Sequence, residues 1–122
     1  MLLICYFISR LVFFIGDFMN VTIECSGNLI IAYLIGEIDH HTAGVIRDRI
    51  DNTLSLKKPQ HLILDFRNVT FMDSSGIGLV MGRYRLMQNF HGTLEIRNVT
   101  LQTKKLMELA GLGSIAIIKE TA

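Results

Sequence analysis

From Val21 onward, the spacing of apolar residues changes repeatedly between a strand period and a helix period, and this alternation is the strongest constraint on the fold. Strands bury every second residue, whereas helices bury residues at intervals of about 3.6. Residues 21–25 and 29–35 follow the strand period on either side of the turn Ser26-Gly27-Asn28, which predicts an antiparallel hairpin. Helical and strand patterns then alternate, in the order β-β-α-β-α-β-α-β. The sequence therefore predicts an α/β fold: a mixed β-sheet with an N-terminal antiparallel hairpin, parallel where helices intervene, and helices packed on the sheet.

Capping and turn residues bound the helices that follow this hairpin. After a loop over residues 36–41, Thr42 is expected to cap a helix that ends before Pro59. One face of this helix is apolar and contains Ala43, Ile46, Ile50 and Leu54. The later elements are a strand at His61–Phe66, a helix from Asp73 to about Phe90, a strand at Thr93–Asn98, a helix at Leu101–Ala110 and a strand at Ser114–Ile118. Gly92 and Gly111 are expected to stop the last two helices, with Leu112 packing beyond the second cap.

The length and charge of the chain limit both its architecture and its partners. With 122 residues, the chain is long enough for one domain with a core and too short for two. A hydrophobic content of 50% with a single proline excludes a disordered chain. A net charge of +1 provides no general attraction to nucleic acid or to an acidic membrane. We therefore expect no nucleic-acid partner and a partner protein that is recognised locally.

The two cysteines, Cys5 and Cys25, form no C-x-x-C pair and lie in apolar surroundings. This pattern is interpreted as a pair of reduced thiols that pack in the protein, which favours a cytoplasmic location.

The first 18 residues form a hydrophobic extension that is unlike the rest of the chain, since Leu2 to Ile15 is apolar apart from Ser9 and Arg10. A membrane-spanning helix needs about 20 apolar residues, and a central arginine costs about 2.5 to 3.5 kcal/mol. A secretory peptide would need a basic start and a small-residue cleavage site. The favoured interpretation is a misassigned start, with residues 1–18 outside the domain, the domain at 19–122 and the hairpin completing the sheet. A membrane tether through residues 1–18 is the alternative.

The segment Phe71-Met72-Asp73-Ser74-Ser75-Gly76 places two hydroxyls and a carboxylate where a strand gives way to a helix. Asp and Ser are preferred capping residues, because their oxygens accept hydrogen bonds from the free amides of the first turn. A serine at a helix N-terminus can also carry a phosphate, which the free amides and the helix dipole favour. The residues alone leave both roles open.

Two enzymatic motifs resemble parts of this segment but do not fit. A nucleophile elbow requires glycines two residues before and two after the serine, whereas Met72 stands before Ser74 and Gly76 after it. The glycines Gly76, Gly78 and Gly82 are similar to a dinucleotide fingerprint, but the third comes one residue late. Small residues that bring the helix close to the sheet explain them better, and a nucleotide-binding domain remains an alternative.

Other polar residues give no sign of a metal site or of catalysis. His40 and His41 are adjacent and are expected to point apart, and neither His61 nor His91 lies at a metal-ligand spacing. Arg83 and Arg85 fit an exposed helix surface, or a surface that faces an acidic partner. We expect no cofactor, no metal and no enzymatic activity.

Two motifs together resemble the anti-sigma factor antagonists, proteins of the STAS domain class. They are Gly36-Glu37-Ile38-Asp39-His40-His41-Thr42-Ala43 and Phe71-Met72-Asp73-Ser74-Ser75-Gly76-Ile77-Gly78, followed by Gly82-Arg83-Tyr84. The resemblance covers Met19 to about Lys119 and keeps the order and spacing of the motifs.

The resemblance implies a STAS-type fold and a regulatory function. The unphosphorylated antagonist would bind an anti-sigma factor that is also a serine kinase and so release a sporulation sigma factor. The kinase would inactivate the antagonist by phosphorylating Ser74, and a serine phosphatase would restore it. The residues expected to contact the partner are Asp39, His40, His41, Thr42, Asp73, Ser75, Gly76, Gly78 and Arg83.

Overall fold

The computed structural model describes residues 7–8, 11–12, 14–18 and 20–121 of the chain. The strands described are β1 (Phe7–Ile8), β2 (Leu11–Val12), β3 (Phe14–Phe18), β4 (Val21–Ser26), β5 (Leu29–Ile38), β6 (His61–Met72), β7 (Thr93–Val99) and β8 (Ile117–Glu120). The helices are α1 (His40–Lys57), α2 (Ser74–Asn89), α3 (Leu101–Leu109) and a short 3-10 helix at Leu112–Ser114.

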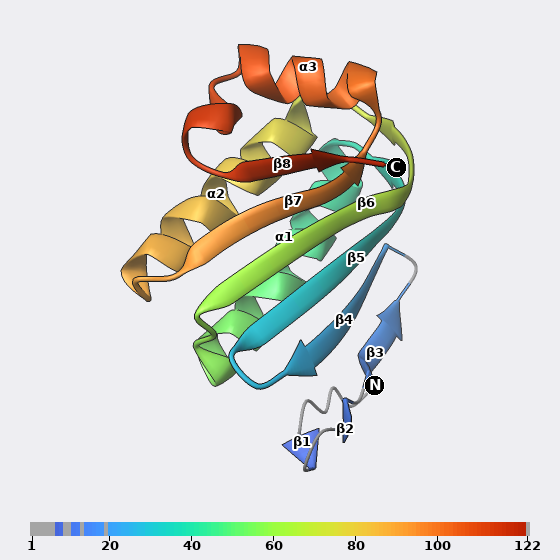
Figure 1. Cartoon of the computed structure of the whole chain (residues 1–122). Coiled ribbons are helices and arrows are strands. Elements are labelled where there is room, and N and C mark those ends of the chain that lie inside the picture. Colours follow the sequence, from blue (N-terminus) through green and yellow to red (C-terminus); the bar gives the residue numbers. More distant parts are fainter. Residues whose placement is uncertain (1–6, 9–10, 13, 19, 122) are drawn as a thin grey trace.

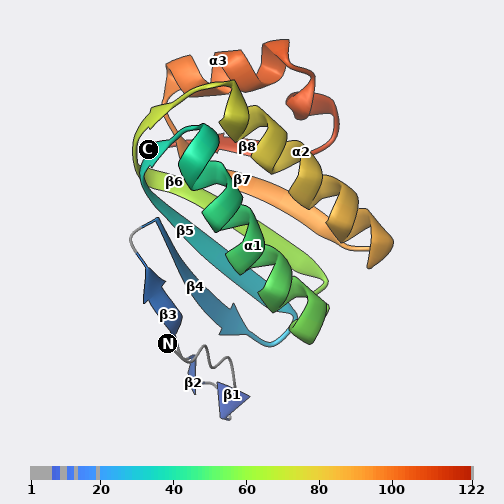
Figure 2. The same ribbon diagram turned by 180° about the vertical axis from the view of Figure 1, so that it is seen from behind.

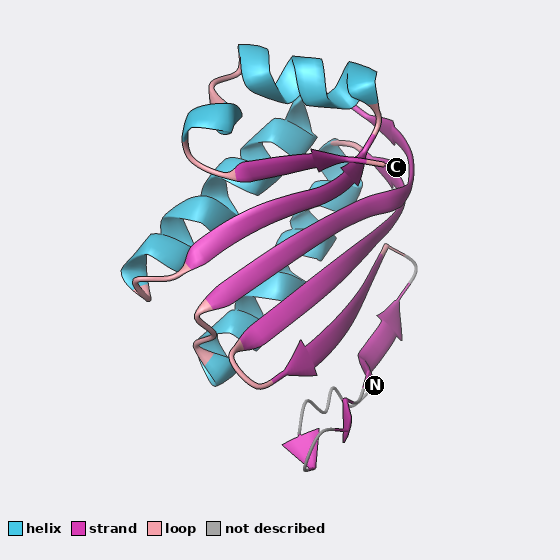
Figure 3. Cartoon of the chain, viewed as in Figure 1, coloured by secondary structure: helices cyan, strands magenta, loops and turns pink. Residues whose placement is uncertain are grey.

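The described strands form one six-stranded sheet in the order β3-β4-β5-β6-β7-β8 and a separate β1-β2 pair (Figures 1 and 3). Pairing is antiparallel from β3 to β5 and parallel from β5 to β8. Helices α1 and α2 lie side by side across one face of this sheet (Figure 2). The predicted mixed sheet with an antiparallel hairpin and packed helices is confirmed.

The core lies between this sheet face and the two helices. The side chains of Ile46, Ile50 and Leu54 on α1 are fully buried, as the helical spacing predicted. They pack in one cluster with alternate residues of the central strands, including Ala32 and Leu64. Burial of apolar surface of this kind is the main force that holds the helices on the sheet.

Strands β5 and β6 are longer than predicted. The sequence predicted a loop at residues 36–41, but parallel pairing continues to Ile38 and Met72, past Gly36 with its φ of +83°. Helix α1 also begins earlier, because Asp39 and not Thr42 is its N-cap. Both changes place the strand ends directly beside the first turns of α1 and α2.

The glycine at each predicted helix stop has a different role. At the end of α2, His91 takes the left-handed conformation, with a φ of +56°. A Cβ on Gly92 would lie 2.7 Å from the carbonyl oxygen of Gln60, so this glycine permits a close approach to the chain before β6. After α3, Gly111 is left-handed and Leu112 is buried, which confirms the predicted cap.

The last strand begins later than predicted, at Ile117 in place of Ser114. The chain first makes a 3-10 turn after Gly111, in which the Ser114 hydroxyl donates a hydrogen bond to the Gly111 carbonyl. Residues 114–116, which were predicted to begin the strand, therefore lie in this turn and in the bend after it.

Part of the predicted N-terminal extension belongs to the sheet. Strand β3 pairs with β4, so the hairpin that starts at Val21 does not complete the sheet by itself, contrary to prediction. Among the described residues, no helix is both long enough and apolar enough to span a membrane. Half of residues 1–18, to which the membrane, secretory and misassigned-start interpretations apply, lie outside the described residues.

The interpretation of Cys25 as a reduced thiol is wrong. Its side chain is buried on β4 and its sulfur is bonded in a disulfide, while Cys5 lies outside the described residues. Cys25 therefore does not support a cytoplasmic location.

Candidate functional site

The exposed residue Ser74 lies at the edge of the sheet where the parallel strands end. It is the first residue of α2, directly after the N-cap Asp73 at the end of β6. The Asp73 amide donates a hydrogen bond to the carbonyl of Ile38, 3.2 Å away, so the ends of β5 and β6 are joined here. The N-termini of α1 and α2 lie at the same end of the molecule (Figure 2). The fold thus brings the Asp39 loop and the start of α2 together.

Asp73 caps α2, and this leaves Ser74 without a capping role. The Asp73 carboxylate accepts a hydrogen bond from the Ser75 amide at 2.8 Å. No acidic residue lies in the first turn of α2, and the positive end of the helix dipole favours an anion there. A phosphate on Ser74 would meet this favourable field but would also lie next to the Asp73 carboxylate.

Asp39 and Thr42 form a capping box at the start of α1. The Asp39 carboxylate accepts hydrogen bonds from the amides of His41 and Thr42 at 2.9 and 3.0 Å, and the Thr42 hydroxyl accepts one from the Asp39 amide. These hydrogen bonds, above all the one from the Thr42 amide, lower the pKa of Asp39. Asp39 therefore has a clear structural role at the predicted partner-binding surface.

His40 and His41 are exposed on the first turn of α1. Their rings contact each other edge to face with centroids 5.7 Å apart, so the expectation that they point apart is wrong. Within the described part of the chain, no group of three His, Cys, Asp or Glu residues is placed to hold a metal ion.

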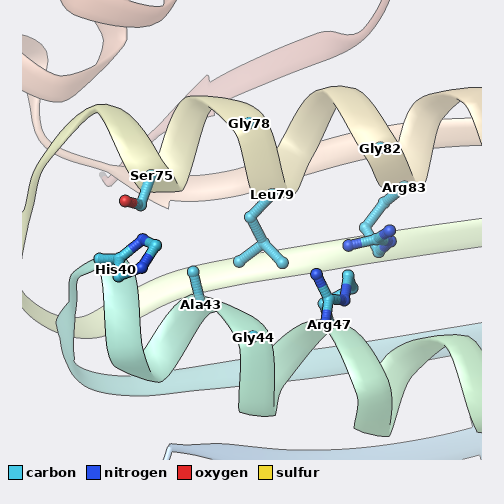
Figure 4. A pocket seen from close by; sticks show the side chains of 9 residues that line it. All are labelled: His40, Ala43, Gly44, Arg47, Ser75, Gly78, Leu79, Gly82 and Arg83. Carbon is cyan, nitrogen blue, oxygen red and sulfur yellow. The ribbon is translucent and has the colours of Figure 1, made fainter.

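A groove of about 320 Å³ lies between α1 and α2 (Figure 4). It is lined by His40, Ala43, Gly44, Arg47, Ser75, Gly78, Leu79, Gly82 and Arg83. A Cβ on Gly78 or Gly82 would have no heavy atom within 4 Å. The expectation that these glycines bring the helix close to the sheet is therefore wrong for both, because they face open space. It holds for Gly76, whose Cβ would overlap the side chain of Met72.

Arg83 is buried, which the exposed-helix interpretation did not predict. Its residue exposure is 5%, and its Nε lies 2.8 Å from Oδ1 of Asp51 on α1. A hydrogen bond of 3.2 Å joins Nη2 to Oδ2 of the same carboxylate. Burial raises the pKa of Asp51 more than the attraction of Arg83 lowers it, and burial likewise lowers the pKa of Arg83. This ion pair links the two helices, and Arg83 also lines the groove.

Two residues at this site, Phe71 and Arg47, were not predicted from the sequence. Phe71 is 54% exposed, three residues before Ser74. Arg47 lines the groove opposite Arg83 (Figure 4). The available signals were a large apolar residue directly before Met72-Asp73-Ser74-Ser75 and an arginine one helical turn after Ala43.

Comparison with known proteins places this arrangement in a family. The family model that describes the STAS domain matches residues 20–122. This chain belongs to the STAS domain family. It is 34% identical over 99 residues to an anti-sigma F factor antagonist of Paenibacillus polymyxa, which covers 80% of this chain and 85% of that protein.

Solved STAS structures agree with this assignment. The chain matches the anti-sigma factor antagonist SpoIIAA in its unphosphorylated form with a TM-score of 0.71 and 30% identity, over 80% of this chain and 86% of that one. It matches Bacillus SpoIIAA in the phosphorylated form with a TM-score of 0.66 and 30% identity, over 80% and 89% of the two chains. The STAS domain of this chain thus has a SpoIIAA-like fold.

Proposed function

We propose that this STAS protein is an anti-sigma factor antagonist that acts by binding and is controlled by phosphorylation of Ser74. In its unphosphorylated form it binds an anti-sigma factor with serine kinase activity and releases a sporulation sigma factor in the cytoplasm. The kinase inactivates it at Ser74, and a serine phosphatase restores it. The names of its relatives and the existence of a phosphorylated SpoIIAA support this proposal.

The observation that carries the proposal is the position of Ser74. Its side chain is exposed at the start of α2, and the neighbouring carboxylate of Asp73 already accepts a hydrogen bond from the amide of Ser75. A kinase can therefore reach the hydroxyl without opening the helix cap. Ser75 is only half exposed, and it lines the groove between the helices.

Phosphorylation changes the charge of this surface where the partner binds. A phosphate adds about 1.5 to 2 negative charges next to Asp73. A partner surface shaped for a neutral serine then loses about 1 to 3 kcal/mol of binding free energy, a change of about 5- to 150-fold in affinity.

The proposal is tested by incubating the purified protein with its anti-sigma factor kinase and ATP, followed by binding measurements. The Ser74→Ala variant is expected to bind the kinase and to remain active after incubation. The Ser75→Ala variant is the matched control, because it loses a hydroxyl one residue away and is expected to be inactivated like the wild type. Equal inactivation of Ser74→Ala and wild type would contradict the proposal.

A further inference from the structure

The groove between α1 and α2 has a chemistry of its own, beyond the phosphoacceptor site. None of its lining residues is acidic, whereas Arg47 lines it from α1 and Arg83 from α2. Both guanidinium groups point into the hollow from opposite sides (Figure 4). Guanidinium groups recognise carboxylates through paired N–H donors.

Arg83 has donors to spare. A guanidinium carries five N–H groups, and Asp51 accepts one hydrogen bond from Arg83, through Nη2. Nε lies 2.8 Å from Oδ1 of Asp51 in the same ion pair, so the donors left for a ligand are on the terminal nitrogens Nη1 and Nη2. A carboxylate that enters the groove and reaches these terminal donors would form charge-assisted hydrogen bonds with them.

Arg47 can bind the same carboxylate with little loss of stability. Its ion pair with Asp48 joins two exposed side chains, at 53% and 68% exposure, and such pairs contribute little stability. The two carboxylates nearest to the arginines, Asp48 and Asp51, do not line the groove.

The groove is also large enough to admit a side chain. Its volume of about 320 Å³ is about ten times the share of one water molecule in the liquid. The space exists because Gly78 and Gly82 carry no side chain and face nothing within 4 Å. It begins at Ser75, next to the exposed phosphoacceptor, and continues along α2 to Arg83.

We propose that this groove receives an acidic side chain of the anti-sigma factor, whose carboxylate binds the guanidinium groups of Arg47 and Arg83. The inference rests on the proposed function and names the chemistry by which the partner is recognised. The bound partner would then cover the groove and Ser74 together.

The test measures binding of the full-length anti-sigma factor kinase to the unphosphorylated chain by calorimetry. Arg47→Gln removes one positive charge from the groove, and Arg85→Gln removes one from an exposed position of α2 outside the groove. We expect Arg47→Gln to weaken binding by about 5- to 30-fold and Arg85→Gln to leave it within about twofold. Equal effects of the two substitutions, or none from Arg47→Gln, would overturn the inference.

A second variant tests the space instead of the charge. Gly82→Leu adds a good helix former where the fold leaves room, so it should raise the melting temperature while filling the groove. Weaker binding by a more stable protein would support the inference, whereas unchanged binding would overturn it.

The two proposals fail in distinguishable ways. Absence of binding and of phosphorylation in the wild type would overturn both the proposed function and the groove inference. Normal binding and phosphorylation of the wild type, together with wild-type affinity of Arg47→Gln, would overturn the groove inference alone.

Discussion

Replacing Asp51 with alanine should destabilise the fold, because it leaves the guanidinium of Arg83 buried without its ion partner. Removing one member of a fully buried pair costs about 3 to 5 kcal/mol, whereas exposed pairs contribute about 0 to 1 kcal/mol. The side chains of Arg83 and Asp51 are 7% and 31% exposed, so the pair is intermediate and the expected loss is about 1 to 3 kcal/mol. For a domain of this size, each kcal/mol lowers the melting temperature by about 3 to 6 °C.

The assay is a double-mutant cycle in urea, with Asp51→Ala, Arg83→Met and the two together. Burial raises the pKa of Asp51 despite the nearby arginine, which indicates that the pair does not fully offset its loss of solvation. The double variant should therefore be more stable than Asp51→Ala alone, and close to the wild type. A loss below about 0.5 kcal/mol for Asp51→Ala, or additive losses in the double variant, would refute this reasoning.

Substitutions at three further positions test the candidate site and the contacts that hold the fold. Asp39→Ala should lower the melting temperature at pH 7, because it removes the capping box. Because the pKa of Asp39 is lower in the folded state, its carboxylate stabilises the fold fully at pH values above the pKa of an unfolded aspartate. This stabilisation is lost as the pH falls through the lowered pKa of the folded state. The difference between variant and wild type should therefore shrink toward pH 2, and a pH-independent difference would contradict the carboxylate role. Asp39→Ala should also weaken kinase binding more than folding, and unchanged affinity would make it a structural cap only. Gly92→Ala should destabilise the fold by about 1 to 3 kcal/mol and so lower the unfolding midpoint in urea, because its Cβ would meet the Gln60 backbone. A wild-type midpoint would show that the Gln60 backbone moves aside without loss of stability. Phe71→Ala should weaken kinase binding without a change in melting temperature, since this ring is largely exposed, and a large thermal loss with normal binding would argue against a contact role.

The sequence predicted the elements of the fold well where periodicity and capping agreed. The face of α1 was correct because Ile46, Ile50 and Leu54 share one side of a helix, and Gly111 with Leu112 formed the expected cap. Strand ends were less predictable, because the pairing of β5 with β6 past residue 35 depends on a partner far away in sequence. Strand β3 was missed because only Phe14 and Ile15 belong to the apolar run, and the Gly16 and Asp17 that follow leave no clear strand period.

At the site, the sequence located the loops but not the groove. The motifs at Asp39 and Ser74 could be placed at one sheet edge, because parallel strands end together. The groove depends on how closely α1 and α2 pack, which no local pattern determines. Arg83 could have been found, since it lies one turn after the buried Leu79 and one turn before the buried Met87. An arginine on the apolar face of a helix indicates a buried partner, and here that partner is Asp51.

The most direct test of the central claim is phosphopeptide mapping after incubation of this chain with its anti-sigma factor kinase and ATP. We expect phosphate on Ser74 alone, at the exposed start of α2, and loss of kinase binding in proportion to the phosphate incorporated. Ser74→Asp should bind poorly without any kinase treatment, because it places a charge where the neutral hydroxyl is needed. Phosphate on Ser75 or Thr70, with Ser74 unmodified, would show that Ser74 is not the residue that the kinase modifies.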